Sequence, residues 1–581
     1  MDNENASLLG GPNNAQRISR NNKLKLVFIG ASILALLSVA ANSSNSPSAK
    51  VPQCTQNGPI VPLTGNPNWI DLFSKNRTYI LAAAERLGGA VRIPTVSFDT
   101  TRGVPPPPEG SPDPIHDGFP KLHAYLQTSF PLLHATLERV VIQRYALLYI
   151  WKGSDPSLEP LVLMAHQDTV PVLPDTLSQW IHEPFSGLVD EENDAIWGRG
   201  SVDTKPSLLG SMEAIEVLIG NGFAPRKTVY LAFGYDEEIS GTEGSQFVAK
   251  YMEETLGLTG KVGLVVDEGL DSLTTENGFN LAVVSTAEKG YMDYHMTLET
   301  PGGHSSIPPL HTGIGLMSQV INALESNPYK VLLTDTNPYL GTVACTAEHS
   351  PNADPHVRKL LQNFGRNSEA LASYLAALSL KDRYRMASSQ AIDIISGGLK
   401  VNALPELVTV DLNNRISIDS SITEFQAQIL RTILPVANQF NLNFTFTDFL
   451  DANKTHTRTS QSAVGTLRVF AKPTDSPLEP SPISSTASKE WKLVEGTIHH
   501  VYEREGAVEK GQVKTFTVAP GLMAGNTDTR YFWKMSKNIL RFAPAPGGQG
   551  YHTVNERASI RGYMTAITFF HELIRNFDEM A

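Results

Sequence analysis

The sequence predicts an α/β domain with a mainly parallel sheet, interrupted by an inserted α+β domain. Three observations support this prediction. The chain has 581 residues, more than one ordinary domain accommodates. Short apolar runs without polar alternation are separated by helical segments in its first half, and strands with a clear apolar–polar alternation begin near residue 288.

The α/β part rests on three apolar runs, 161–165, 228–234 and 261–267. A run without alternation is typical of a strand that is buried on both faces. The intervening segments 208–219 and 246–255 have helical periodicity. Alternating strands and helices predict a mostly parallel sheet, whose active site lies beyond the carboxyl ends of the strands.

The pattern changes in the middle of the chain. Segments 291–299 and 407–416 alternate like half-exposed strands, whereas 313–325 and 422–439 are helical. This mixture predicts a separate α+β domain inserted into the first one. The expected segments are a cytoplasmic tail (1–25), a transmembrane signal-anchor (26–41), a disordered stalk (42–65), the first part of the catalytic domain (66–287), an inserted lid domain (288–485) and the second part of the catalytic domain (486–581).

The N-terminus predicts one transmembrane helix. Lys23 and Lys25 precede an uncharged run, 26–41, which as a helix is about 24 Å long, slightly short of the hydrocarbon core of a bilayer. Basic residues ahead of the run favour a cytoplasmic N-terminus and a translocated remainder, as in a type II membrane protein. A secreted protein is the alternative, because Ser38–Ala40 resembles a signal-peptide cleavage site.

Charge and cysteine content exclude some classes of protein. The formal net charge of −12 argues against nucleic acid as a partner. Two cysteines, Cys54 and Cys345, are too few for a Cys-rich metal site, so a metal would need His and carboxylate ligands. One disulfide and two separate thiols are both compatible with the sequence. Acceptor sequons for N-glycosylation stand at Asn76, Asn443 and Asn453.

Side chains that suit metal chemistry follow the predicted strands. His166 and Asp168 close the first strand, and residues two apart on a strand face the same side. A histidine that binds a metal usually has its other ring nitrogen oriented by a carboxylate or carbonyl. Asp203 precedes the helix 208–219, and a carboxylate there has two oxygens with which to bridge two ions.

Adjacent acids close the next two strands. Glu237 and Glu238 end one, and Asp267 and Glu268 end the other. Buried acids are costly unless a cation neutralises them, and of two neighbours one can bind a metal while the other acts as a base. Together with the distant His552, these residues offer a set of nitrogen and oxygen ligands for two zinc ions.

Seven motifs make the chain resemble the M20 metallopeptidase family, specifically its carboxypeptidase S branch (Gly-X carboxypeptidases). The motifs are HQDTVPV, WGRGSVDTK, DEEISGTEG, VVDEG, PGGHSS, VNALPE and GYHTVNER. The resemblance implies a two-zinc, aminopeptidase-like catalytic domain with a lid or dimerisation domain and two Zn²⁺ per subunit. It also implies these roles: His166, Asp203, Glu238, Asp267 and His552 as metal ligands, Asp168 and Glu237 as catalytic residues, and His304, Asn402 and Arg415 as substrate-binding residues.

The implied activity is release of a C-terminal amino acid from short peptides. Glu237 would act as general base, and Arg415 with Asn402 would hold the free carboxylate, for which the planar guanidinium is well suited. Asp267 stands where many relatives have Glu, which leaves Glu268 as an alternative ligand. The other interpretations are an N-acyl-amino-acid hydrolase with the same site and an inactive lumenal binding protein. A vacuolar location and a homodimer complete the expectations.

Overall fold

The computed structural model describes residues 51, 53–64, 69–269, 272–276, 279–471, 477–503 and 515–581. The expected cytoplasmic tail (1–25) and signal-anchor (26–41) lie outside these residues. None of the helices in the described part of the chain is both long enough and apolar enough to span a bilayer.

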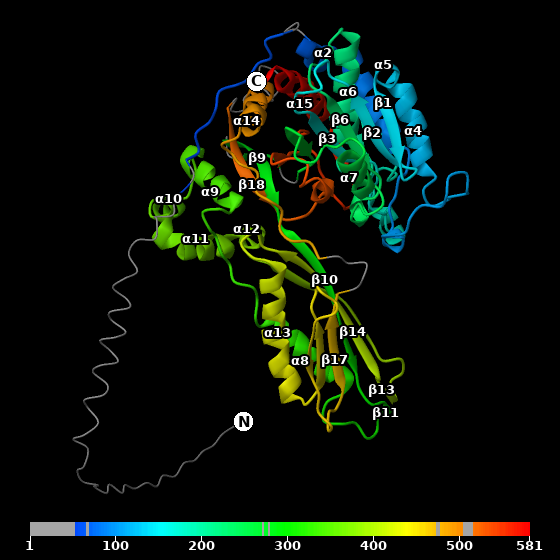
Figure 1. The fold of residues 1–581 in the computed structure, drawn as a ribbon, viewed down its shortest axis with the longest axis vertical. Coiled ribbons are helices and arrows are strands. Elements are labelled where there is room, and N and C mark those ends of the chain that lie inside the picture. Colours follow the sequence, from blue (N-terminus) through cyan, green and yellow to red (C-terminus); the bar gives the residue numbers. More distant parts are fainter. Residues whose placement is uncertain are drawn as a thin grey trace, which may run out of the picture. The chain divides into compact units, whose positions relative to one another are not determined.

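The described residues form a nine-stranded sheet at the centre of the larger domain (Figure 1). Its strand order is β1-β2-β6-β3-β7-β19-β9-β18, with β8 paired to β9. The strands are β1 (Glu138–Ile142), β2 (Ala146–Trp151), β3 (Leu161–His166), β6 (Val229–Gly234), β7 (Leu264–Asp267), β8 (Leu273–Glu276), β9 (Phe279–Glu288), β18 (Phe516–Met523) and β19 (Ile539–Arg541). The three predicted apolar runs are the neighbouring parallel strands β3, β6 and β7.

The sheet is mixed, so the expectation of a mainly parallel sheet is wrong in part. Strand β2 forms a hairpin with β1 and also runs antiparallel to β6. Strand β19 is parallel to β7 but antiparallel to β9. The sequence pattern missed this because a strand buried on both faces looks the same in either direction.

Helices cover both faces of this sheet. Leu161, Leu163 and Ala165 of β3 belong to the core that includes the long helices, whereas Val162 and Met164 belong to the core under α7. Both faces of β3 are therefore apolar, which explains its run without alternation. The helices of this domain are α2 (Trp69–Lys75), α3 (Arg77–Val91), α4 (Gly118–Ser129), α5 (Pro131–Thr136), α6 (Lys205–Gly220), α7 (Ser245–Glu254), α14 (Lys489–Tyr502) and α15 (Ile560–Glu579). A separate three-stranded sheet, β20-β5-β4, joins β4 (Leu188–Asp190) and β5 (Ala195–Trp197) to β20 (Arg557–Ser559).

A second sheet forms the elongated lid domain (Figure 1). Its order is β12-β14-β10-β17-β15-β16, and α8 (Gly313–Glu325) and α13 (Ile422–Gln439) pack with it into one apolar core. The strands are β10 (Gly290–Glu299), β12 (Ser389–Gly397), β14 (Leu407–Ile416), β15 (Asn443–Thr447), β16 (Thr455–Arg458) and β17 (Thr466–Phe470). Strand β9 of the catalytic domain leads into β10 through Lys289 alone, so the lid begins at the end of the central sheet.

Part of the expected lid segment packs on the catalytic domain instead. The helices are α9 (Pro338–His349), α10 (Pro355–Leu361), α11 (Phe364–Leu378) and α12 (Leu380–Met386). Helix α9 lies along β18, where the Thr342 hydroxyl donates to the Pro520 carbonyl at 2.6 Å. Cys345 on α9 forms a disulfide with Cys54, which resolves the alternative between a disulfide and two thiols.

The expectation of a disordered stalk over 42–65 is wrong for residues 53–64, which are bound to the catalytic domain. The Asn57 amide donates to Glu495, and the backbone amides of Leu63 and Thr64 donate to Glu579. These partners lie on α14 and α15, hundreds of positions along the chain. The polar composition of this segment predicts disorder, and composition alone does not reveal partners that lie so far along the chain.

Candidate two-metal active site

His166 is oriented by its own strand end. It is buried at the end of β3, and its Nδ1 lies 3.0 Å from the backbone carbonyl and 3.3 Å from the carboxylate of Asp168. A proton on Nδ1 satisfies these acceptors, which leaves the Nε2 lone pair for a metal. The predicted role of Asp168 as orienting residue therefore has a geometric basis, shared between its carbonyl and its carboxylate.

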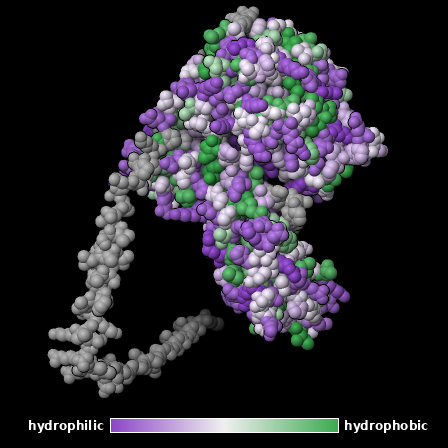
Figure 2. Space-filling model, viewed as in Figure 1, coloured by the Kyte–Doolittle hydropathy of each residue, from purple (hydrophilic) through white to green (hydrophobic). Residues whose placement is uncertain are grey.

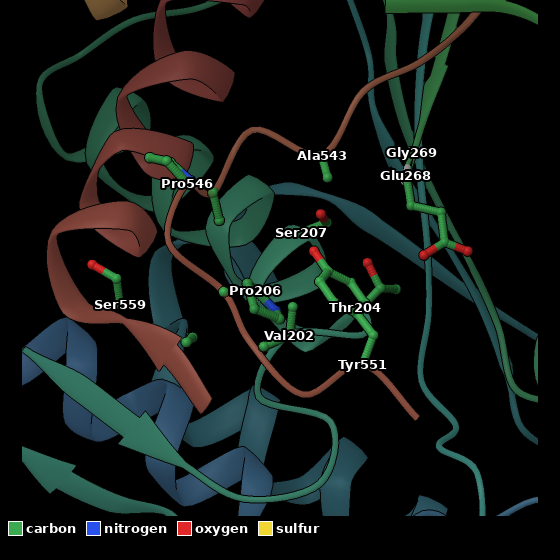
Figure 3. Close-up of a pocket in the computed structure, with 13 residues that line it drawn as sticks. Val202, Thr204, Pro206, Ser207, Glu268, Gly269, Ala543, Pro546, Tyr551 and Ser559 are labelled. Atoms are coloured by element: carbon green, nitrogen blue, oxygen red, sulfur yellow. The ribbon is translucent and has the colours of Figure 1, made fainter. Parts of the chain in front are cut away.

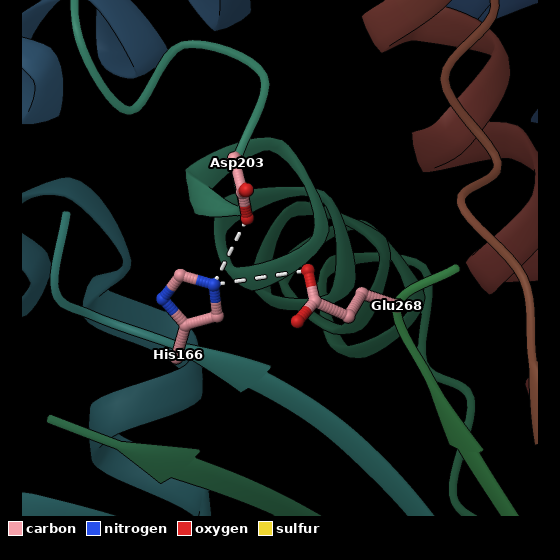
Figure 4. A group of neighbouring side chains, drawn as sticks. All are labelled: His166, Asp203 and Glu268. Atoms are coloured by element: carbon pink, nitrogen blue, oxygen red, sulfur yellow. Dashed lines mark hydrogen bonds and ion pairs between the residues drawn. The ribbon is translucent and has the colours of Figure 1, made fainter. Parts of the chain in front are cut away.

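Asp203 lies between His166 and His552, and Figure 4 shows its contact with His166. Its Oδ1 is 3.0 Å from His166 Nε2, and its Oδ2 is 3.0 Å from His552 Nε2. Each oxygen of one carboxylate thus belongs to a different group of candidate ligands. This is the arrangement that a carboxylate bridging two metal ions requires.

Each group is completed by a glutamate. Glu268 Oε2 lies 3.7 Å from His166 Nε2, and Glu238 Oε2 lies 3.1 Å from His552 Nε2. The first group is His166, Asp203 and Glu268; the second is Asp203, Glu238 and His552. Their donors come from the ends of β3, β6 and β7 and from two loops, so the site lies beyond the carboxyl ends of the parallel strands, as the sequence predicted.

Glu268 belongs to the group of candidate ligands around His166, whereas Asp267, the ligand favoured by the sequence, belongs to neither group among the described residues. Asp267 is the last residue of β7, and its carboxylate is buried with Oδ2 lacking a hydrogen-bond partner among the described residues. Neighbouring residues at a strand end project to opposite sides. Glu268 projects toward His166 (Figure 4).

Glu237 stands beside the ligands without belonging to either group. Asp168 fixes this segment, because its two carboxylate oxygens accept the backbone amides of Glu237 and Glu238, each at 3.1 Å. The Ser97 hydroxyl donates to the same carboxylate at 2.7 Å. Asp168 therefore positions both His166 and the pair of glutamates, and Glu237 remains available as a general base.

The site concentrates negative charge in a buried place. Burial and the charge of Asp203 raise the pKa of Glu268 to about 8, and burial with the charge of Glu268 raises the pKa of Glu237 well above its usual range. Hydrogen bonds to Asp203 and Glu238 raise the pKa of His552 to about 10. Burial alone would raise the pKa of Asp203, but hydrogen bonds from His166 and His552 hold it well below its usual range. Such clusters of perturbed acids are typical of functional sites.

The residues fit a pair of zinc ions. Two donor atoms at about 2.0–2.2 Å from one tetrahedral ion lie about 3.3–3.6 Å apart. The four nitrogen–oxygen distances above, 3.0, 3.0, 3.1 and 3.7 Å, bracket that value. Histidine nitrogen and carboxylate oxygen are also the donors that zinc accepts in catalytic sites.

A narrow pocket opens next to this centre (Figure 3). Val202 and Thr204 line it from the Asp203 loop, Tyr551 from the His552 loop, and Glu268 from the end of β7. The pocket is therefore lined by the same loops that carry the candidate ligands.

Arg415 is the predicted substrate-binding residue that the structure places near the centre. It lies at the end of β14 that adjoins the catalytic domain, where its Nη1 donates to Asn526 Oδ1 at 2.5 Å and its guanidinium stacks 4.9 Å from the Tyr291 ring. Burial and the neighbouring Arg530 lower its pKa, while Glu237 acts in the opposite direction. Asn526, which sequence reasoning missed, thus orients the guanidinium.

His304 and Asn402 lie elsewhere, so the structure does not assemble the predicted substrate-binding set. Both are exposed at the lid tip, where β11 (Gly303–His304) pairs with β13 (Ala403–Leu404) (Figure 1). Strand β14 separates this tip from Arg415, and eight residue steps along a strand span about 26 Å. The sequence motifs gave no measure of this length.

The three sequons differ in accessibility. Asn76 and Asn453 are exposed, Asn76 as the N-cap of α3 and Asn453 in a turn. Asn443 is half-buried in β15, and its side chain accepts the Ser460 amide at 2.8 Å. Its Oδ1 therefore already accepts a hydrogen bond inside the lid.

Comparison with known proteins shows the family of the chain. Residues 162–576 match the family described as Peptidase family M20/M25/M40. Carboxypeptidase S of Saccharomyces cerevisiae is 36% identical, over 91% of this chain and 90% of its own length. An N-fatty-acyl-amino acid synthase/hydrolase of Bos taurus is 29% identical over 86% and 88% of the two chains. The solved structure of an M20 family metallo-carboxypeptidase from Sulfolobus solfataricus has a similar fold, with a TM-score of 0.56 and 18% identity over 86% of this chain and 99% of that one.

Fold, site and similarity together define a metal-dependent peptidase. The chain belongs to the M20/M25/M40 peptidase family, and within it to the carboxypeptidase S group. The resemblance seen in the seven motifs is thereby confirmed.

Proposed function

We propose that this protein is a two-zinc carboxypeptidase that releases the C-terminal amino acid of short peptides. The observation that carries the proposal is the Asp203 carboxylate, each oxygen of which lies 3.0 Å from a different histidine. His166, Asp203 and Glu268 would hold one ion, and Asp203, Glu238 and His552 the other. The similarity to carboxypeptidase S supports the same activity.

The chain's own residues supply the remaining chemistry. Bound zinc ions acidify water and polarise the scissile carbonyl. Glu237, held by Asp168, takes the proton from the attacking water and delivers it to the leaving amine. Arg415, stacked on Tyr291 and oriented by Asn526, binds the free carboxylate of the substrate. The specificity for a C-terminal residue then follows from the distance between this guanidinium and the zinc centre.

A substrate comparison tests this function against its alternative. The same site could hydrolyse N-acyl amino acids, which also carry an amide next to a free carboxylate, and the similarity to an N-fatty-acyl-amino acid synthase/hydrolase favours this activity only weakly. A blocked Gly-X dipeptide and the matching N-palmitoyl amino acid should be given to the zinc-loaded enzyme. We expect a kcat/KM at least tenfold higher for the dipeptide; a preference for the fatty amide would contradict the proposal.

A second copy of the chain would complete the site. His304, which would stabilise the oxyanion, and Asn402 lie at the lid tip, too far along β14 to reach the zinc centre of their own chain. The lid offers apolar surface for pairing: Ile394 and Ile395 on edge strand β12 are 59% and 56% exposed, and hydrophobic residues also show on the visible face of the lid (Figure 2). We therefore infer a homodimer. Mixing inactive His304→Ala and Glu237→Gln chains should restore about a quarter of the activity, and no recovery in a mixed dimer would contradict it.

The location is part of the same proposal. A type II anchor at 26–41 would place the catalytic domain in the vacuolar lumen, and the alternative is secretion after cleavage. The Cys54–Cys345 disulfide supports an oxidising compartment. Asn76 and Asn453 are exposed and are the more accessible glycosylation acceptors, whereas Asn443 is half-buried. In intact vacuoles we expect the catalytic domain to be protected from added protease, and glycosidase treatment to lower its mass. A cytosolic chain without glycans would contradict this location.

A further inference from the structure

Glu556 lies near the site and has no role in the proposed mechanism, yet its carboxylate accepts several hydrogen bonds. It is fully buried, and its Oε1 accepts the backbone amides of Gly200 at 2.9 Å and Val202 at 3.0 Å. The Asp203 amide lies 3.4 Å from the same oxygen. Its Oε2 accepts a hydrogen bond from Arg199 Nη1 at 2.5 Å. One side chain from the His552 loop thus organises the whole loop that leads to Asp203.

The contacts also run in the opposite direction. Arg199 Nη2 donates to the Thr553 carbonyl at 3.2 Å, next to His552. The Gly198 amide donates to the Glu556 carbonyl at 2.9 Å. Glu556 and Arg199 therefore form a reciprocal clamp between two loops that are far apart in the sequence. A buried, charge-assisted pair of this kind is strong only while both partners are present.

His552 is the candidate ligand that most needs such support. Its side chain is 52% exposed, against 13% for Asp203 and 6% for Glu238. Its backbone φ of 54° lies in the left-handed region, which residues other than glycine adopt at a cost unless their surroundings impose it. The loop that carries His552 therefore depends on contacts outside the ligand group, and the clamp supplies some of them, beside those of Asn555 with residues 179–181.

We propose that Glu556, paired with Arg199, is a positioning residue that holds His552 against Asp203, so that breaking the pair weakens the second metal position selectively. The first position is affected less, because only one of its ligands, Asp203, lies on a clamped loop, whereas the second position has both Asp203 and His552 there. The inference deepens the proposed function and rests on its two-metal site. Residues that orient metal ligands typically change metal affinity by about 10- to 100-fold when they are altered.

Zinc binding measured one equivalent at a time tests the inference. The full chain, its Glu556→Gln variant and its Arg199→Lys variant should be equilibrated over a series of buffered free zinc concentrations, and bound zinc measured by mass spectrometry of the metal. We expect the second equivalent to bind about 10- to 100-fold more weakly in both variants, and the first equivalent to change less than threefold. Arg199→Lys keeps the positive charge, and this variant alone tests the inference if Glu556→Gln does not fold.

A matched control separates positioning from general stability. Glu213 is another buried glutamate of this domain, paired with Arg86 on α3. Glu213→Gln should lower the melting temperature while both zinc affinities stay unchanged. Equal weakening of both positions, an equal effect of Glu213→Gln, or unchanged binding in the clamp variants would overturn the inference. A wild-type chain that never binds a second zinc would contradict the two-metal proposal itself.

Discussion

Asp203 Oδ2 lies 3.0 Å from His552 Nε2, although the two residues come from distant parts of the catalytic domain's sequence. The other oxygen of the same carboxylate faces His166 at an equal distance. One short side chain therefore joins the two halves of the candidate centre. The consequences for metal binding, catalysis and pH dependence follow from this arrangement.

Asp203→Asn should weaken both metal positions. An asparagine amide offers one oxygen and one NH2 group, and the NH2 group does not bind a cation, so the side chain cannot give one oxygen to each of two ions. We expect both zinc affinities to fall at least tenfold and kcat/KM to fall by three orders of magnitude or more. Zinc titration with parallel kinetics checks this, and a variant that loses only one ion would show that Asp203 does not bridge.

Glu237→Gln should separate catalysis from metal binding. The variant keeps the size and burial of the side chain but removes the general base, whose contribution is typically about 100- to 10,000-fold. We expect kcat to fall by about 100- to 10,000-fold or more, while both zinc ions stay bound. Substantial turnover in a fully zinc-loaded variant would refute the assignment of the base.

Glu268→Gln and Asp267→Asn should behave differently. Glu268 lies 3.7 Å from His166 Nε2, and Asp267 lies outside both ligand groups. We expect the first variant to lose affinity at the His166 position at least tenfold, and the second to keep it within about threefold. Zinc competition with a chromogenic chelator distinguishes them, and the reverse order of effects would restore Asp267 as the ligand.

Zinc should stabilise the fold more at high pH than at low pH. In the protein without zinc, burial and the charge of Asp203 raise the pKa of Glu268 to about 8. Hydrogen bonds to Asp203 and Glu238 raise the pKa of His552 to about 10. In both groups the folded state holds a proton that the unfolded state has lost, so the stability of zinc-stripped protein falls as pH rises from about 4.5 to 10. Zinc displaces these protons. The difference in melting temperature between zinc-loaded and stripped protein should therefore grow from pH 5 to pH 8; a constant or shrinking difference would contradict the assignment.

Arg415→Lys should change substrate recognition while the metals remain. A lysine keeps the charge but loses the planar pair of donors that a carboxylate accepts. We expect KM for a blocked dipeptide to rise at least tenfold, and the preference for a free carboxylate over a C-terminal amide to shrink. Arg468→Lys, on an exposed part of the lid, is the control and should leave both parameters unchanged. An unaltered preference in Arg415→Lys would place the carboxylate elsewhere.

The sequence predicted the elements that are fixed by local patterns. The apolar runs gave β3, β6 and β7, and the acids at their ends gave most of the site, because carboxyl ends of parallel strands meet at one edge. The adjacent pair Asp267 and Glu268 could not be resolved, since the alternation near a strand end does not say which neighbour faces His166.

Features that depend on distant contacts were not predictable in this way. Residues 53–64 look disordered by composition, yet they bind α14 and α15 through partners hundreds of positions away. The tip of the lid carries His304, and only the length of β14 shows how far this tip is from Arg415. The clamp of Glu556 and Arg199 was missed for the same reason, because its donors are backbone amides that no motif identifies.

The most direct test of the account is a crystal structure of the zinc-loaded protein with an anomalous difference map at the zinc edge. Two peaks about 3.5–4 Å apart, one on either side of the Asp203 carboxylate, are predicted, with Glu268 and Glu238 each bound to one of them. A single peak, or a second peak that does not contact Asp203, would contradict the two-metal centre.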